Sequence, residues 1–303
     1  MELKEIFSDS LRFPSNNWTK LLILGVFLVI GNLLVNQVYS TSLGNSTPIL
    51  ILGLVLSIIG LIVYLIAEGY VFDVLRSTIN GINESPDFNF VNNLVEGIKV
   101  FVVEIVYFII PFIITVILVF ITGLLSVERL FGNPITGNFV DVSAVPILPI
   151  VIVSIVVLIL FIIFGLFLQI AISRMADTGK LSEAFNFKEI YNTIGQIGWG
   201  NYIVWYIVLF LIILLIVIAL GLVFGLLSLL LLIPVIGLIG IVLIFVLFII
   251  VSLLLHPYIM LFSSRALGLL YLTKDSKSVV TENKTDDSIE SESDNKDEST
   301  EEL

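Results

Sequence analysis

The sequence predicts an all-α integral membrane protein with six transmembrane helices, arranged as three hairpin repeats with interfacial amphipathic helices. Of the 303 residues, 58% are hydrophobic, and the mean hydropathy of +1.14 is far above that of soluble domains. Six apolar stretches meet or approach the roughly 20 residues that a helix needs to cross about 30 Å of hydrocarbon. They cover residues 20–38, 48–72, 100–122, 147–172, 202–228 and 236–262.

The distribution of basic residues predicts the orientation of these spans. Of the 14 Lys and Arg residues, 13 fall on one side of the six-span threading, and Arg129 alone falls on the other. Cytoplasmic loops retain Lys and Arg because basic loops resist translocation. We therefore expect a multi-pass protein of the cell membrane with both termini in the cytoplasm, and with the lipid bilayer as its main partner.

The first and last apolar regions each allow a second interpretation. Residues 202–264 contain no Asp, Glu, Lys or Arg, but they are too long for one span, and Pro234 with Gly237 predicts a turn between two. A cleavable signal peptide is the alternative to a first span. Acidic residues precede this stretch and no small-x-small site follows it, so an uncleaved span is preferred.

Each returning span ends in an arginine, which is the basis of the predicted repeat. These residues are Arg76, Arg174 and Arg265, separated by 98 and 91 positions. Related segments, Phe88-Asn89-Phe90 and Phe185-Asn186-Phe187, follow the first two arginines. Because each unit starts and ends on the cytoplasmic side, we expect three parallel hairpins with the arginines at equivalent depths.

Three surface segments, one before each hairpin, read as amphipathic helices. Leu3, Ile6, Phe7 and Leu11 share one face of the first, and Ser85-Pro86-Asp87 resembles the start of the second. In the third, apolar residues recur at helical spacing. Such helices lie in the headgroup plane or pack against the protein, and both alternatives stay open. The residues of the third are Phe187, Ile190, Tyr191, Ile194 and Ile197.

Aromatic and small residues give two further expectations. Tryptophans and tyrosines at the span entrances are expected at the membrane interface; they are Trp18, Trp199, Tyr202, Trp205 and Tyr206. Glycines within the spans could let helices pack closely, or serve ordinary packing. They include Gly53, Gly60, Gly221 and Gly225.

Several short motifs occur together in the first third of the chain. They are Glu68-Gly69-Tyr70, Val74-Leu75-Arg76, Glu84-Ser85-Pro86-Asp87-Phe88 and Leu94-x-x-Gly97-x-Lys99. With these motifs the chain resembles a known family, the multi-pass membrane proteins grouped as domain of unknown function 4013. The layout is also distantly similar to the membrane domains attached to some glycerophosphodiester phosphodiesterases. The resemblance covers about residues 1–272 and implies a prokaryotic, mostly archaeal membrane protein without an established activity.

Four polar residues within the spans form a candidate intramembrane polar layer: Glu68, Glu104, Gln169 and His256. Counted from the nearest basic residue, they lie about 7 to 14 Å deep, and an ionisable residue at such a depth is a functional hypothesis. A transport pathway predicts that they face one cavity. Alternatively, each reaches water or pairs with Lys99 or Arg265.

Composition and motifs argue against an enzyme. The chain has no cysteine and one histidine, so no metal site built on several Cys or His ligands is possible, and no cofactor is expected. Asp177-Thr178-Gly179 matches the triplet of aspartic proteases, which need two such carboxylates. A helix end closed by glycine is the simpler explanation. The sequence shows no surface that combines basic and aromatic residues, so no nucleic-acid partner is expected.

The C-terminal region differs from the rest of the chain. We divide the protein into a six-helix transmembrane domain, residues 1–272, and a disordered acidic cytoplasmic tail, residues 273–303. Residues 275–303 carry 11 acidic and three basic side chains and no aromatic ring, too little apolar surface to offset chain entropy. The tail is a solvating segment or a docking site for a basic partner.

Three classes of function follow from these observations. A non-enzymatic membrane scaffold or accessory protein, with an unidentified membrane or cytoplasmic protein partner, is favoured because the sequence shows no catalytic constellation. A small-solute or ion pathway, proton-linked through the polar layer, is the alternative. An enzyme acting on lipid has the least support.

Overall fold

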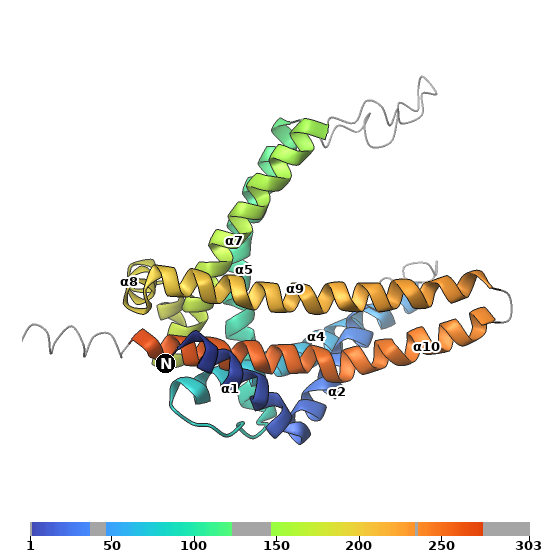
Figure 1. Ribbon diagram of the computed structural model, residues 1–303, viewed down its shortest axis with the longest axis horizontal. Coiled ribbons are helices and arrows are strands. Elements are labelled where there is room, and N and C mark those ends of the chain that lie inside the picture. The colour runs from blue at the N-terminus through green and yellow to red at the C-terminus, as the bar shows by residue number, and fades with distance from the viewer. Residues whose placement is uncertain (1, 37–46, 123–146, 234–235, 275–303) are drawn as a thin grey trace, which may run out of the picture.

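The computed structural model describes residues 2–36, 47–122, 147–233 and 236–274 (Figure 1). In these ranges the chain forms helices and no strands. Six helices are long and apolar enough to cross a membrane, which confirms the predicted all-α membrane fold. Of the predicted tail, residues 273–303, Thr273 and Lys274 belong to the last helix, and residues 275–303 lie outside the described residues.

The spans pair into three hairpins in chain order. The first contains α2 (Trp18–Val35) and α4 (Thr47–Ile79), the second α5 (Phe90–Ile121) and α7 (Ile147–Thr178). The third joins α9 (Trp199–Leu229), with the 3-10 turn η3 (Leu230–Leu232), to α10 (Ile236–Ile250). A π-helical turn, η4 (Val251–Leu255), continues α10, and the helix then runs on to Lys274. The long stretch without Asp, Glu, Lys or Arg therefore forms two spans, as predicted.

The hairpins share a packed end and diverge from it. In Figure 1 the α5–α7 pair leaves this end in a different direction from the α9–α10 pair. The largest core cluster joins α1, α4, α5, α7, α8 and α9 to the C-terminal part of the last helix, near the three arginines. Only 6% of the most apolar 18-residue window is buried in each of the last three spans. Most of each span therefore exposes apolar side chains, as a lipid environment requires.

The first surface helix, α1 (Leu3–Asn16), forms as predicted, but the protein itself covers its apolar face. Ile6 is fully buried, and the ring of Phe7 stacks on Trp205 at 6.4 Å and packs against Phe262 at 6.3 Å. Leu11, which we expected on the same face, is exposed. Packing against the protein, rather than burial among lipid headgroups, therefore accounts for this face.

The prediction of a second surface helix starting at Ser85 was wrong. Residues 82–89 are not helical, and α5 begins at Phe90 with Asn89 as its N-cap, whose side chain accepts from the Asn92 backbone N–H at 3.1 Å. Pro86 and Asp87 resemble a helix start in sequence, but Asp87 instead pairs with Lys20 of α2. The surface segment is thus the first part of the span itself.

The third surface segment forms η2 (Leu181–Phe185) and α8 (Phe187–Ile197). Its predicted single apolar face divides in two: Ile190, Ile194 and Ile197 are fully buried, whereas Phe187 and Tyr191 are exposed. The end of α7 before it matches the prediction of a glycine cap. Gly179 has φ +70° and donates its N–H to the Met175 carbonyl at 3.0 Å.

Trp18, expected at the membrane interface, is exposed, whereas Tyr202 and Trp205, expected there too, are fully buried. The Tyr202 hydroxyl donates to the Leu166 carbonyl at 2.5 Å, and the two rings stack at 6.2 Å. Both residues lie in the first two turns of α9, where Tyr202 contacts α7 and Trp205 contacts α1 instead of the headgroups. They are therefore part of the core at the packed end.

Candidate functional site

Each of the three arginines forms an ion pair with the segment that begins the next hairpin. Arg76 reaches Glu96 of α5 at 3.2 Å, and Arg174 reaches Glu183 of η2 at 2.6 Å. Arg265 reaches Asp9 of α1 at 2.9 Å, so the third pair joins the last span to the first helix. These pairs fasten the hairpins to one another at the packed end.

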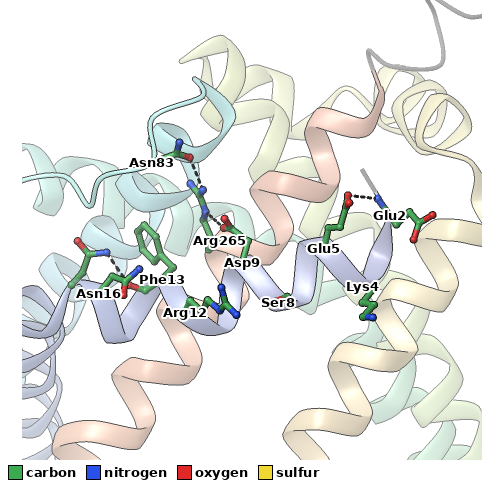
Figure 2. Close-up of a pocket in the computed structure, with 11 residues that line it drawn as sticks. Glu2, Lys4, Glu5, Ser8, Asp9, Arg12, Phe13, Asn16, Asn83 and Arg265 are labelled. Atoms are coloured by element: carbon green, nitrogen blue, oxygen red, sulfur yellow. Dashed lines mark hydrogen bonds and ion pairs between the residues drawn. The ribbon is translucent and has the colours of Figure 1, made fainter.

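Arg265 is the most enclosed of the three, with 3% of its surface exposed. Besides Asp9, its guanidinium donates to the Asn83 side chain at 2.8 Å and to the Ile82 carbonyl at 3.1 Å, and lies over the Phe13 ring at 5.1 Å. Figure 2 shows Arg265 between Asp9 and Asn83. One side chain thus joins α1, the loop before α5 and the last helix.

The ion pair between Arg174 and Glu183 keeps the carboxylate charged. The guanidinium hydrogen bond lowers the pKa of the Glu183 carboxyl group, and the same guanidinium donates to the Thr193 hydroxyl at 3.1 Å. The carboxylate is therefore ionised at neutral pH, and the pair holds η2 and α8 against the end of α7.

A close crossing of α4 and α5 positions Glu68 and Glu104. A Cβ atom at Gly69 would overlap the carbonyl oxygen of Asn93, and one at Gly97 would overlap the carbonyl oxygen of Leu65. Only glycine allows these backbones to approach so closely. Glu68 precedes the first glycine, and Glu104 lies two turns beyond the second, so the crossing brings both to one side of the helix pair.

Polar contacts also hold α4 and α5 together closer to the packed end. The Asn93 amide donates to Asp73 at 2.6 Å, and Glu96 accepts from Lys99 at 3.1 Å. Lys99 and Arg265 thus have acidic partners of their own, Glu96 and Asp9. Among the described residues no Lys or Arg forms an ion pair with Glu68 or Glu104.

The four residues of the predicted polar layer line one pocket of about 300 Å³ between α4, α5, α7 and the helix after η4. Glu68, Glu104 and Gln169 are half-buried, and His256 is exposed. The volume is at the lower end of the range of about 300 to 1,000 Å³ for small-molecule sites. The remaining lining residues are Val71, Phe72, Leu75, Val100, Ile172, Ile259, Met260, Ser263, Ser264 and Leu267.

Two neighbours add polarity to the pocket. The Tyr64 hydroxyl lies beside Glu68, one turn earlier on α4. Ser264 donates to the Val71 carbonyl at 2.8 Å, which ties the last helix to α4 at the wall of the pocket. Sequence reasoning missed the contribution of the last helix beyond His256, although Met260, Ser263 and Leu267 follow it at helical spacing and share its face.

The charge balance of this pocket determines what it can bind. A carboxylate in a low-dielectric site needs a proton or a cation beside it, because an uncompensated charge there costs several kcal/mol. Glu68 and Glu104 come from different helices and have no basic partner among the described residues. The pocket can therefore hold either protons or a positively charged ligand on the same two groups.

A second pocket, of about 840 Å³, lies along the polar side of α1 (Figure 2). Acidic and basic residues alternate in its lining, and its most enclosed cation, Arg265, is already paired with Asp9. Because the lining carries both charges, it does not favour a ligand of either sign. Its lining residues are Glu2, Lys4, Glu5, Ser8, Asp9, Arg12, Phe13, Asn16, Asn17, Asn83 and Arg265.

These features define a multi-pass membrane protein with a pocket between four of its helices that contains four polar side chains. The chain belongs to the family described as Protein of unknown function (DUF4013), whose model matches residues 52–225, more than half of its length. The match includes Glu68, Glu104 and Gln169 and ends before His256. No curated protein and no solved structure matches the chain.

Proposed function

We propose that the protein is a proton-linked pathway for a small cationic solute, and that Glu68, Glu104, Gln169 and His256 form its binding site. The observation that carries this proposal is the pair of glutamates in one pocket without a basic partner among the described residues. Protons and a cation would compete for the two carboxyl groups, which couples binding of the cation to release of protons. Gln169 and His256 supply further polar contacts.

A scaffold function, favoured by composition alone, predicts instead that the four polar residues face separate partners. Their shared pocket supports the pathway. No group of three or more potential metal ligands occurs in the described part of the chain. The protein in this proposal acts without a cofactor and without enzymatic chemistry.

Binding should release protons. The purified protein in detergent and weak buffer, titrated with sodium, potassium or tetramethylammonium chloride, is expected to release protons with at least one of the three. Glu68→Gln and Glu104→Gln should each abolish the release, because an amide neither carries the charge nor gives up a proton. Calorimetry gives the affinity, and a pH-sensitive dye gives the proton count.

Glu84→Gln is the matched control, since Glu84 is exposed and lies outside the pocket. It should bind and release protons like the wild type, and all three variants should elute as the wild type does in size exclusion. Proton release that persists in both pocket variants, or none with any of the three cations, contradicts the proposal.

We propose further that the packed end with its three arginines faces the cytoplasm, on the basis of the 13-to-1 distribution of basic residues. A fluorescent protein fused after Leu272 should then fluoresce in cells, and alkaline phosphatase at the same position should be inactive. An active phosphatase fusion would place the tail outside and reverse the orientation of the pathway.

A further inference from the structure

The last span is interrupted where it meets the pocket. Residues 251–255 form a π-helical turn between α10 and the helix that continues to Lys274. Pro257 explains the position of the break: it has no N–H to donate to the Leu253 carbonyl four residues earlier, and its ring crowds that carbonyl. A π-helical turn accommodates such a defect, and turns of this kind are frequent at functional sites.

Helix α2 packs against this break. A Cβ atom at Gly25 would overlap the carbonyl oxygen of Leu253, the same carbonyl that Pro257 leaves without its usual helical donor. The close approach therefore requires glycine at position 25, and α2 acts as a fixed surface beside the interrupted turn.

The two halves of the span differ in how they are held. After the break, Arg265 is enclosed by its four partners, Ser264 binds Val71, and Tyr271 and Lys274 both donate to Asp177, at 2.8 and 2.7 Å. Before the break, Gly240 is the one buried residue of α10. The half after the break, the inner half, is thus anchored to α1, α4 and α7. The half before the break, the outer half, contacts mainly its hairpin partner, α9 with η3.

The pocket lies directly on the anchored side of the break. His256 is the first residue after the π-helical turn and lines the pocket together with Ile259 and Met260. A change of angle at residues 251–255 would move α10 relative to the exposed His256 and to the pocket that His256 lines.

We infer that the π-helical turn at Val251–Leu255 is a hinge on which α10 swings to open and close the pocket toward the side of the membrane opposite the arginines. The role of this hinge rests on the proposed pathway. The evidence for the hinge itself is the break, the Gly25 contact and the unequal anchoring of the two halves. The hinge supplies the moving element that a binding site needs to release its ligand away from the packed end.

Spin labels can measure this motion because the chain contains no native cysteine. One pair, Leu33→Cys on α2 with Val246→Cys on α10, reports on the outer half; both positions are exposed. In liposomes this pair should show two distances separated by at least about 5 Å, one helical turn. Their populations should shift between pH 5 and pH 8 and on adding tetramethylammonium.

A second pair, Asn16→Cys with Leu272→Cys, reports on the anchored half and should show one distance under all conditions. In the outer pair, Pro257→Ala restores the missing N–H and should leave a single distance, because a regular helix removes the hinge. A single outer distance in the wild type, unchanged by pH, cation or Pro257→Ala, overturns the inference.

The hinge and the pathway can fail separately. Two outer distances that merge in Pro257→Ala, in a protein that binds none of the three cations, would keep the hinge and remove the pathway. Proton release that depends on Glu68 and Glu104, with a single rigid outer distance, would keep the pathway and remove the hinge.

Discussion

Arg265→Met should lower the stability of the protein by about 3 kcal/mol, the largest effect we expect from a single side chain. Removing one member of a buried ion pair typically costs about 3 to 5 kcal/mol. The lower end applies because Asp9, with 43% of its side chain exposed, can still be hydrated. The Ile82 carbonyl and the Asn83 side chain would each lose a hydrogen bond from the guanidinium. Thermal unfolding in detergent measures the loss.

Arg12→Met is the control for this substitution. Arg12 lies on α1 close to Asp9, is exposed, and forms no ion pair among the described residues. Its replacement should change stability by less than about 0.5 kcal/mol. If Arg265→Met unfolds at the same temperature as Arg12→Met, Arg265 does not fasten α1 to the last helix.

Alanine at either crossing glycine should destabilise the protein by about 1 to 3 kcal/mol, the usual cost of overpacking. In Gly69→Ala and Gly97→Ala the added methyl group would meet a backbone carbonyl of the facing helix. Because backbone cannot rotate away as a side chain can, α4 and α5 must separate. The separation should also move Glu68 from Glu104 and weaken cation binding at least tenfold.

Gly200→Ala tests whether the crossing, rather than helical glycine in general, is responsible. Gly200 is in α9, and no heavy atom lies within 4 Å of a Cβ atom built there. Alanine should therefore be neutral or stabilise by about 0.5 to 1 kcal/mol through its higher helix propensity. Equal melting temperatures for Gly97→Ala and Gly200→Ala would exclude a tight crossing.

The number and order of the spans could be predicted from the sequence because both depend on local properties. Hydropathy over about 20 residues identifies a span whatever it packs against, and Gly179 closes α7 through its own backbone conformation. The start of α5 was missed because Ser85-Pro86-Asp87 has the local pattern of a helix start, whereas Asp87 pairs with Lys20, 67 residues away.

Contacts between distant helices were less accessible to sequence reasoning. Spacing alone gave no reason to prefer Gly69 and Gly97 over Gly221 and Gly225, yet nothing in the structure lies within 4 Å of a Cβ atom at the latter two. Gly60 does meet α2, where a Cβ atom would lie 2.5 Å from the Val35 nitrogen. Which glycine meets a neighbour depends on how the hairpins cross, and a single sequence does not encode that in any local pattern.

For the four polar residues, too, local properties were predictable and contacts between helices were not. Their depth was predicted from helical rise alone, whereas their presence in one pocket depends on the crossing of α4 with α5 and on the anchored last helix. The hairpin repeat remains a prediction, which superposition of the three hairpins on Arg76, Arg174 and Arg265 can test. Each arginine binds the start of the next segment, and the third returns to α1.

The central claim is that Glu68 and Glu104 exchange protons for a cation across the membrane, and transport in proteoliposomes tests it most directly. Tetramethylammonium is a suitable first probe because it has no neutral form that could cross lipid unaided; sodium and potassium are tested in the same way. With a pH-sensitive dye trapped inside, an external pulse of a transported cation should raise the internal pH as protons leave. Glu84→Gln should behave as the wild type, and Glu68→Gln and Glu104→Gln should show no change. An internal pH that stays constant in the wild type with all three cations, or that rises equally in the two pocket variants, would contradict the account.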